Sequence, residues 1–292
     1  MPNISVRKSL SIMKMEYVKW VCDARMIMMV ITFIFIQTCA VTPLLERSTK
    51  MHSPINIWEP FIAVGNSGVL ILILPLVYIC LMSDFPSMDG NTLFVMHRVG
   101  RFNWFVGQIL FAIASFLSYL LAIVAFSVLP VITKGFLANG WSLVVTDFDH
   151  QFPDEAGGFA SQLLPMNLYN QMPPYKAAIY TYLLLAGYMM LLVLLMLLFQ
   201  VCKKKLVGFF VTGSIIAVGT ALCAIKTSFM WLTPMAHSIV WLHFTEYFRS
   251  NVVEIWKSAL YFGIGIVLLI VLCFLVLRKM NFESVGEGGE GN

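Results

Sequence analysis

The residues best suited to specific recognition lie in the polar interval from Ser83 to Gln108. This interval carries two acids, one histidine and two arginines: Asp84, Asp89, His97, Arg98 and Arg101. Each charge placed in hydrocarbon costs several kcal/mol, so these side chains belong in water or against a soluble partner. Asp89 can cap a helix that begins near Asn91, and apolar residues follow at mixed helical spacing. The pattern predicts a short helix along the membrane surface.

The two arginines of this interval suggest what it could bind. Arg98 and Arg101 stand three residues apart, a spacing that places both on one face of a helix. Such a pair can contact acidic or carbonyl groups of a partner, with Phe94 as an apolar anchor. Two other interpretations stay open: an ordinary solvated loop between spans, and arginines that bind lipid phosphates.

Three further patterns could indicate ligand binding. His243 and Glu246 stand one helical turn apart near His237 and Met235, but no third firm metal ligand accompanies them, which favours polar anchors at lipid headgroups. The acidic run at 147–155 lacks the ligand order and glycine of an EF-hand, which favours a solvated loop. The six cysteines form no CxxC pair, which is typical of buried free thiols. We expect no catalytic residue, metal or cofactor in this chain.

The composition places these polar stretches in a membrane protein. Of the 292 residues, 59% are hydrophobic and 12% are charged, and the mean hydropathy is +0.83. Soluble domains are about 45–50% apolar and about 25% charged. The chain is therefore predicted to be an all-α integral membrane protein without a separate soluble domain. We expect no nucleic-acid partner.

Six apolar runs are long enough to cross a hydrocarbon core of about 30 Å. They cover residues 26–45, 60–82, 104–132, 177–201, 206–225 and 258–277. Pro43 is expected to end the first span and Pro75 to kink the second. Residues 1–25, basic on one side and apolar on the other, predict an amphipathic helix in the membrane interface. Residues 26–280 would form the six-span domain, and the acidic, glycine-rich residues 281–292 a flexible tail.

The intervals between the later spans differ in character. Residues 134–176 are acidic and rich in turn residues, so we expect a solvated external loop. The Lys203–Lys205 run is short enough to make spans four and five a tight antiparallel hairpin. Residues 226–257 are too polar to span and too aromatic for a free loop, which predicts a re-entrant or interfacial hairpin buried against protein.

Lysine and arginine set the expected orientation. An even number of spans puts both termini on one side, together with the 83–108 interval and the lysine turn. That side carries twelve Lys and Arg residues and the other side seven. The positive-inside rule then predicts a multi-pass protein of the cell membrane with both termini in the cytoplasm.

This arrangement resembles the permease subunit of bacterial type-2 ABC exporters. The resemblance covers nearly the whole chain and is architectural: an N-terminal interfacial helix, six spans, a cytoplasmic helix between spans two and three, and a re-entrant segment before span six. The most family-like sequence detail is Arg98-x-x-Arg101-x-x-Trp104-x-x-Gly107-Gln108, in which a basic pair precedes the glycine that opens the third span. The chain lacks the long external domain of the mechanotransmission class.

The resemblance implies a coupling helix at residues 89–101 that docks a separate ABC ATPase subunit. The docking residues so implied are Asp89, Phe94, His97, Arg98 and Arg101. It also implies a dimer with a second or homologous permease, in which Gly213 of the small-residue stretch in span five is the packing candidate. The chain has no Walker lysine motif, so ATP would be bound by the partner subunit and the chain itself would not be an enzyme.

The resemblance thus predicts an exporter of a peptide, a lipid or a hydrophobic compound, embedded among membrane lipids. Two rival classes fit less well: a membrane-embedded enzyme needs facing ionisable groups at membrane depth, and a secondary transporter usually shows interrupted spans in matching halves. The remaining alternative is a non-transporting accessory or immunity membrane protein. An adjacent ATP-binding-cassette gene would favour the exporter, and its absence the accessory protein.

Overall fold

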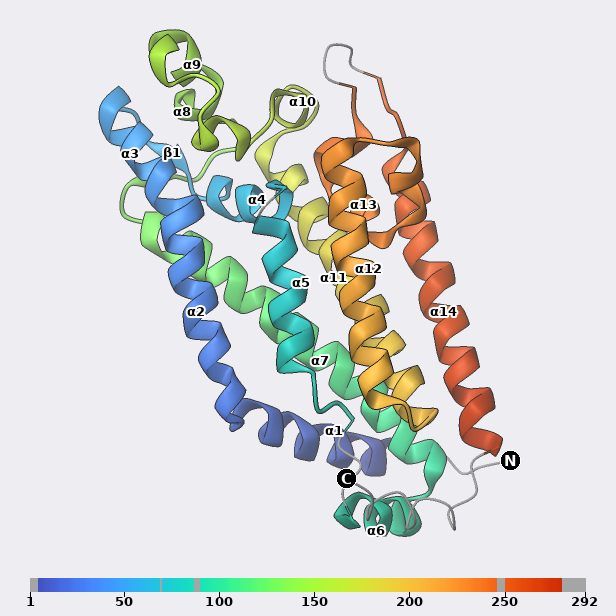
Figure 1. Ribbon diagram of the computed structural model, residues 1–292. Helices are drawn as coiled ribbons and strands as arrows, with labels where there is room; N and C mark the ends of the chain where they lie inside the picture. Colours follow the sequence, from blue (N-terminus) through green and yellow to red (C-terminus); the bar gives the residue numbers. More distant parts are fainter. Residues whose placement is uncertain (1–4, 69, 87–89, 246–249, 280–292) are drawn as a thin grey trace.

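The structure is a computed structural model that describes residues 5–68, 70–86, 90–245 and 250–279. Its helices run up and down between two ends of a bundle (Figure 1). We name these ends by what lies there. The platform end holds helices α1 (Val6–Val21) and α6 (Gly90–Val99) and the turn at 202–204, and the cap end holds the segment 134–173 and helix α13 (Pro234–Ser238).

Five helices are long and apolar enough to cross a membrane, and a sharply bent pair is a sixth if it counts as one span. The five are the stretch 24–51, α7 with its extension η3 (Arg101–Val128, Leu129–Val131), α11 (Pro174–Val201), α12 (Lys205–Ile225) and α14 (Ile255–Lys279). The bent pair is α4 (Glu59–Asn66) with α5 (Leu70–Leu81). The positions of the expected spans agree with these helices, and the class is an all-α membrane protein.

Helix α11 lies at the centre of the bundle. In the most apolar part of α11, 56% of the residues are buried inside the protein. In the most apolar part of α14, only 22% are buried. Helix α11 packs against α4, α7, α12, α13 and α14. A helix that is apolar all round belongs where every face meets protein, and the uniformly apolar sequence of α11 fits this position.

The first span does not end at Pro43, as its sequence suggested. After η1 (Ala24–Met26) and α2 (Ile27–Ile36), a π-helical turn η2 (Gln37–Val41) leads into α3 (Thr42–Met51). Pro43 lies in the first turn of α3, where a helix tolerates a missing N–H, and the π turn accommodates the changed hydrogen bonding. The helix ends instead at His52, whose left-handed backbone terminates it.

The second span breaks at Ser67 rather than at Pro75. Helix α5 continues through Pro75, whereas α4 and α5 meet at a bend of 79°. The break is stabilised by Asn66: its backbone carbonyl accepts the Trp241 indole N–H (2.7 Å), its side-chain oxygen accepts Val240 N–H (2.9 Å), and its amide donates to Thr181 Oγ1 (2.8 Å). Residues distant in sequence thus supply hydrogen-bond partners for the end of α4, which hydrocarbon could not provide.

The segment 134–173, which we call the cap, is folded and is not the solvated loop expected from its composition. It contains the strand β2 (Gly135–Phe136), which pairs in parallel with β1 (Ile55–Asn56). Five short helical segments follow: α8 (Leu143–Thr146), α9 (Phe148–Gln151), η4 (Pro153–Glu155), η5 (Phe159–Gln162) and α10 (Met166–Tyr169). Their buried side chains, such as Val144, Phe148 and Leu163, join the core of the bundle or cover α3.

Polar contacts of Arg47 and Glu59 help to hold the cap to the bundle. Arg47 of α3 lies over the Phe148 ring at 4.2 Å and donates to Ser161 Oγ at 2.6 Å. Glu59, fully buried at the start of α4, accepts hydrogen bonds from the backbone N–H and the hydroxyl of Ser142. The acidic sequence misled because its apolar residues are spaced irregularly, and only tertiary contacts show that they are buried.

Helix α1 lies across the platform end and packs along the first half of α7 (Figure 1). Ile12 and Trp20 are buried on the side that faces the bundle, while Val6 and Val18 are exposed on the other side. The close approach depends on Gly107, because a Cβ there would lie 2.8 Å from Ile12 Cβ and 3.0 Å from Ser9 O.

Gly107→Ala is therefore expected to displace α1 and to destabilise the protein by about 1–3 kcal/mol, the usual cost of overpacking. Thermal unfolding of the purified protein in detergent measures the effect. The matched control is Gly263→Ala on α14, where an added Cβ would meet nothing within 4 Å. Equal melting temperatures for the two variants would show that α1 is not held closely against α7.

Candidate functional site

Helix α6 lies outside the spans and connects α5 to α7 at the platform end (Figure 1). It begins at Gly90, next to the expected start at Asn91, while Asp89, the expected cap, lies outside the described residues. His97 and Arg98 occupy its last turn, where the helix dipole favours cations. The segment expected to dock a partner is thus a separate helix outside the bundle.

The described side chains of α6 point both toward the bundle and away from it. Met96 is 3% exposed, and Val95 and Val99 pack partly against the core. Phe94 is 78% exposed, and His97 and Arg98 are also exposed. An exposed phenylalanine beside cationic side chains combines an apolar anchor with charged groups, which is the composition of a protein-binding surface.

The arginine pair does not lie on one helical face, as the three-residue spacing suggested. Gly100 adopts a left-handed backbone with φ of 90° and separates α6 from α7. Its N–H donates to Met96 O (2.9 Å), which closes α6, and its carbonyl accepts Trp104 N–H (3.1 Å), which opens α7. Arg98 therefore belongs to α6 and Arg101 to α7. Glycine permits this junction because it lacks the Cβ that disfavours positive φ.

A hollow of about 690 Å³ opens beside α6, between the start of α7 and the end of α14. Arg101, Arg278 and His97 contribute polar groups to its lining, and the rings of Phe102 and Phe274, 5.2 Å apart, contribute an apolar wall. Three residues that carry or can carry positive charge around one hollow favour an acidic ligand or partner segment.

Asp84, the acid of this interval that lies within the described residues, is engaged within the chain. Its carboxylate accepts a hydrogen bond from Arg25 and another from Lys205 Nζ at 2.6 Å. Burial raises the pKa of Asp84, but the hydrogen bonds and charges of Lys205 and Arg25 outweigh burial and lower the pKa below its ordinary value. The clamp contributes stability at neutral pH and loses it as the pH falls through this lowered pKa. Asp84 therefore fixes the loop after α5.

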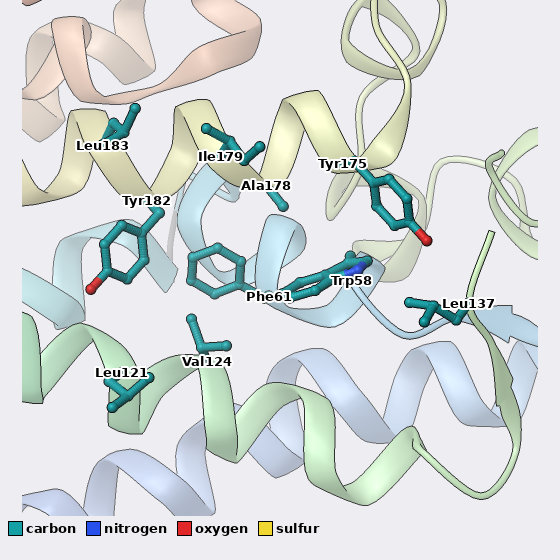
Figure 2. A pocket seen from close by; sticks show the side chains of 10 residues that line it. All are labelled: Trp58, Phe61, Leu121, Val124, Leu137, Tyr175, Ala178, Ile179, Tyr182 and Leu183. Carbon is teal, nitrogen blue, oxygen red and sulfur yellow. The ribbon is translucent and has the colours of Figure 1, made fainter. Parts of the chain in front are cut away.

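A second hollow, of about 650 Å³, lies between α7 and α11 beneath α4. Figure 2 shows the Phe61 ring between the rings of Tyr182 and Tyr175, with Leu121 of α7 below and Ile179 of α11 above. The lining is almost entirely apolar and aromatic. At the edge nearest the cap, the buried indole N–H of Trp58 has no hydrogen-bond partner among the described residues. The hollow suits a hydrocarbon chain.

The remaining candidate residues do not form a metal site in the described part of the chain, where no three His, Cys, Asp or Glu side chains are grouped to hold an ion. Glu246 lies outside the described residues. His237 and His243 are buried and bind Ser258 instead. Gly213 is part-exposed on α12, and a Cβ there would come no closer than 3.9 Å to Ile79, so this position leaves room on its surface.

We compared the chain with protein-family models, with curated proteins and with solved structures, and none of the three comparisons found a match. The resemblance to type-2 ABC permeases therefore depends on the arrangement of elements alone.

Proposed function

We propose that this protein is the membrane-spanning subunit of an ATP-driven ABC exporter and that α6 docks a separate ATPase subunit. The observation that carries the proposal is α6 itself: a short helix outside the spans, placed between the second and third of them, with Phe94 and Arg98 exposed. A docked helix of this kind can transmit movement, because α6 is joined to α7 through a single glycine.

The surroundings of α6 support the proposal. The hollow lined by Arg101 and Arg278 would receive acidic or carbonyl groups of the ATPase, while Phe94 would enter an apolar pocket on its surface. The Asp84 clamp holds the loop before α6 against α12, so force on α6 would reach two spans. The sequence contains no Walker lysine motif, so ATP would be bound by the partner.

The cargo follows from the hollow between α7 and α11. Its apolar and aromatic walls favour a lipid-like or hydrophobic compound over a small ion. In the exporter, this compound would leave the cytoplasm and pass toward the cap end. A second permease copy, in contact through α12 near Gly213, would complete the pathway.

The proposal predicts an ATP-binding-cassette gene next to the gene of this chain, and co-expression of the two genes tests it. We expect the two proteins to purify together, and we expect the complex in lipid nanodiscs to hydrolyse ATP faster than the ATPase alone. A chain that neither binds the ATPase nor stimulates it would contradict the proposal and favour the accessory or immunity protein.

The proposed orientation predicts a labelling result. A chain that keeps Cys202 as its sole cysteine, exposed in the turn at the platform end, should react in intact cells only with membrane-permeant thiol reagents. A cysteine-free chain with Ala156→Cys in the cap should react with impermeant reagents, because this position is also exposed. The reverse pattern would place α6 outside the cell, where no cytoplasmic ATPase could reach it.

A further inference from the structure

Two histidines converge on one serine hydroxyl at the cap end. His237 lies in α13 and His243 in the 3-10 helix η7 (Val240–His243), and both pack against the first turns of α14. His237 Nδ1 and His243 Nε2 each lie 2.7 Å from Ser258 Oγ. Ser258 and His243 are fully buried and His237 is 6% exposed, so this cluster is closed to bulk water.

The other nitrogen of each ring fixes where its hydrogen must be. His237 Nε2 lies 2.8 Å from the carbonyl oxygen of Trp231, and His243 Nδ1 lies 2.9 Å from that of Ile239 and 3.2 Å from that of Val240. A carbonyl oxygen can only accept, so both of these nitrogens must carry hydrogen. In neutral rings, the two nitrogens that face Ser258 would then both be acceptors.

Ser258 cannot satisfy two acceptors, because a hydroxyl has one hydrogen to donate. If it donates to one ring, it presents only lone pairs to the other at 2.7 Å. A single extra proton removes this conflict: the second ring then donates to Ser258 Oγ, and all five contacts become hydrogen bonds. Rotation of the hydroxyl lets either ring take the extra proton.

We propose that His237, Ser258 and His243 form a buried proton-binding site, which holds one proton shared between the two rings and thereby fastens the segment 234–243 to α14. This inference does not depend on the proposed transport function. With the proton bound, the segment is tied to Ser258 by two bonds. When the proton leaves, one of the two contacts becomes a repulsion between lone pairs, so the attachment weakens as the pH rises.

The surroundings of the cluster suit one positive charge and disfavour two. The rings meet three carbonyl oxygens and electron-rich aromatic faces: His237 stacks on Tyr261 at 4.1 Å, and the Trp231 ring lies 5.3 Å from His237 and 5.2 Å from His243. A second proton would place two cations on one oxygen, and His237 already disfavours charge on His243.

Other ionisable groups on the elements around the cluster are few among the described residues. Tyr261 of α14 donates its phenol hydrogen to Leu232 O at 3.0 Å. The phenol of Tyr188 in α11 lies near the thiol of Cys223 in α12 and near Tyr261. Lys257 and Glu254, near the start of α14, are exposed and form an ion pair with each other, with 3.5 Å between Lys257 Nζ and Glu254 Oε2. Lys226, at the end of α12, lies over the Trp241 ring of η7 at 5.6 Å. Burial lowers the pKa of His243, and charge on His237 lowers this pKa further.

Burial and the number of hydrogens needed for the contacts at Ser258 predict different protonation states of the two rings, which makes the inference testable. Burial lowers the pKa of both histidines, that of His243 to about 4. Burial alone would therefore favour the neutral form of both rings at about pH 6, slightly below the ordinary pKa of histidine. A shared proton predicts one charged ring among the two at the same pH.

The measurement is nitrogen-15 NMR of the full chain labelled at histidine, in lipid nanodiscs, across the pH range in which histidines titrate. The chain has five histidines, and single substitutions of His52, His97 and His150 to Gln identify the signals of the remaining two. We expect the summed protonation of His237 and His243 to be one at about pH 6 and to fall as the pH rises. Two neutral rings at about pH 6 would overturn the proposal.

Two substitutions of Ser258 separate the proton site from a merely structural role. Ser258→Thr keeps the hydroxyl and should keep the shared proton. Ser258→Ala removes the atom that accepts the bond from the charged ring, so the midpoint of proton uptake should move down by at least about one pH unit, a tenfold loss of proton affinity. Amide hydrogen exchange at 234–243 should rise with pH in the wild type and Ser258→Thr. Equal midpoints for Ser258→Ala and Ser258→Thr would contradict the proposal.

Discussion

Replacing Glu59 by Ala is expected to loosen the cap and to destabilise the protein by about 2–5 kcal/mol. Glu59 Oε1 accepts Ser142 N–H at 2.7 Å, and Oε2 accepts the Ser142 hydroxyl at 2.8 Å and Asn56 N–H at 3.1 Å. All three residues are buried. Alanine leaves two buried backbone N–H groups without acceptors, and each such group costs about 1–3 kcal/mol.

The loss should appear as a lower melting temperature and as faster proteolysis within the exposed residues 153–158 of the cap. The matched control is Lys50→Ala, which removes another tie between α3 and the cap, the exposed 2.6 Å pair of Lys50 with Glu155. Because both partners are about half exposed, this change should cost no more than about 1 kcal/mol. Equal effects for the two variants would show that Glu59 does not anchor the cap.

The second large effect is expected from reversing both arginines near α6. The variant Arg98→Glu with Arg101→Glu should lose the ATPase from the purified complex and should lose stimulated ATP hydrolysis. Removing one member of a buried charge pair at an interface costs about 2–5 kcal/mol of binding free energy, which weakens association at least about 30-fold. The two residues lie on different helices joined at Gly100, so both helices would contribute to the contact.

The control for this experiment is Lys204→Glu in the turn between α11 and α12. Lys204 is exposed at the same end of the bundle, whereas Lys205 is unsuitable because it binds Asp84. Lys204→Glu should retain the ATPase and its stimulation. Both variants must first reach the membrane in normal amounts, because arginines also anchor membrane proteins. A double variant with full partner binding would exclude α6 as the docking surface.

The spans could be predicted because a run of about twenty consecutive apolar residues is visible in the local sequence. The break in the second span could not, because Asn66 ends α4 through contacts with Val240 and Trp241, about 175 residues away in sequence. The cap was missed for the same reason: Glu59 meets Ser142 across 83 residues. Pro43 misled in another way, because a π turn before it lets the helix continue.

The candidate site was predictable in part. The start of α6 was predicted to within one residue from a helix-capping acid, but the spacing of Arg98 and Arg101 could not reveal that Gly100 would separate them onto two helices. The histidine cluster gave a partial signal, since His237 and His243 stood in a polar, aromatic stretch. Its third member, Ser258, is an inconspicuous residue of the last span and is brought there only by packing.

The central claim, that α6 docks an ATPase, is tested most directly by cross-linking from Phe94. A photoreactive phenylalanine analogue at position 94, which is 78% exposed, should cross-link to the co-expressed ATPase in membranes. The matched control is the same analogue at Phe229 in η6 (Ser228–Leu232) near the cap end, which is 75% exposed. We predict a cross-linked product from position 94 and none from position 229. A product from position 229 alone, or from neither position in a chain that stimulates ATP hydrolysis, would contradict the account.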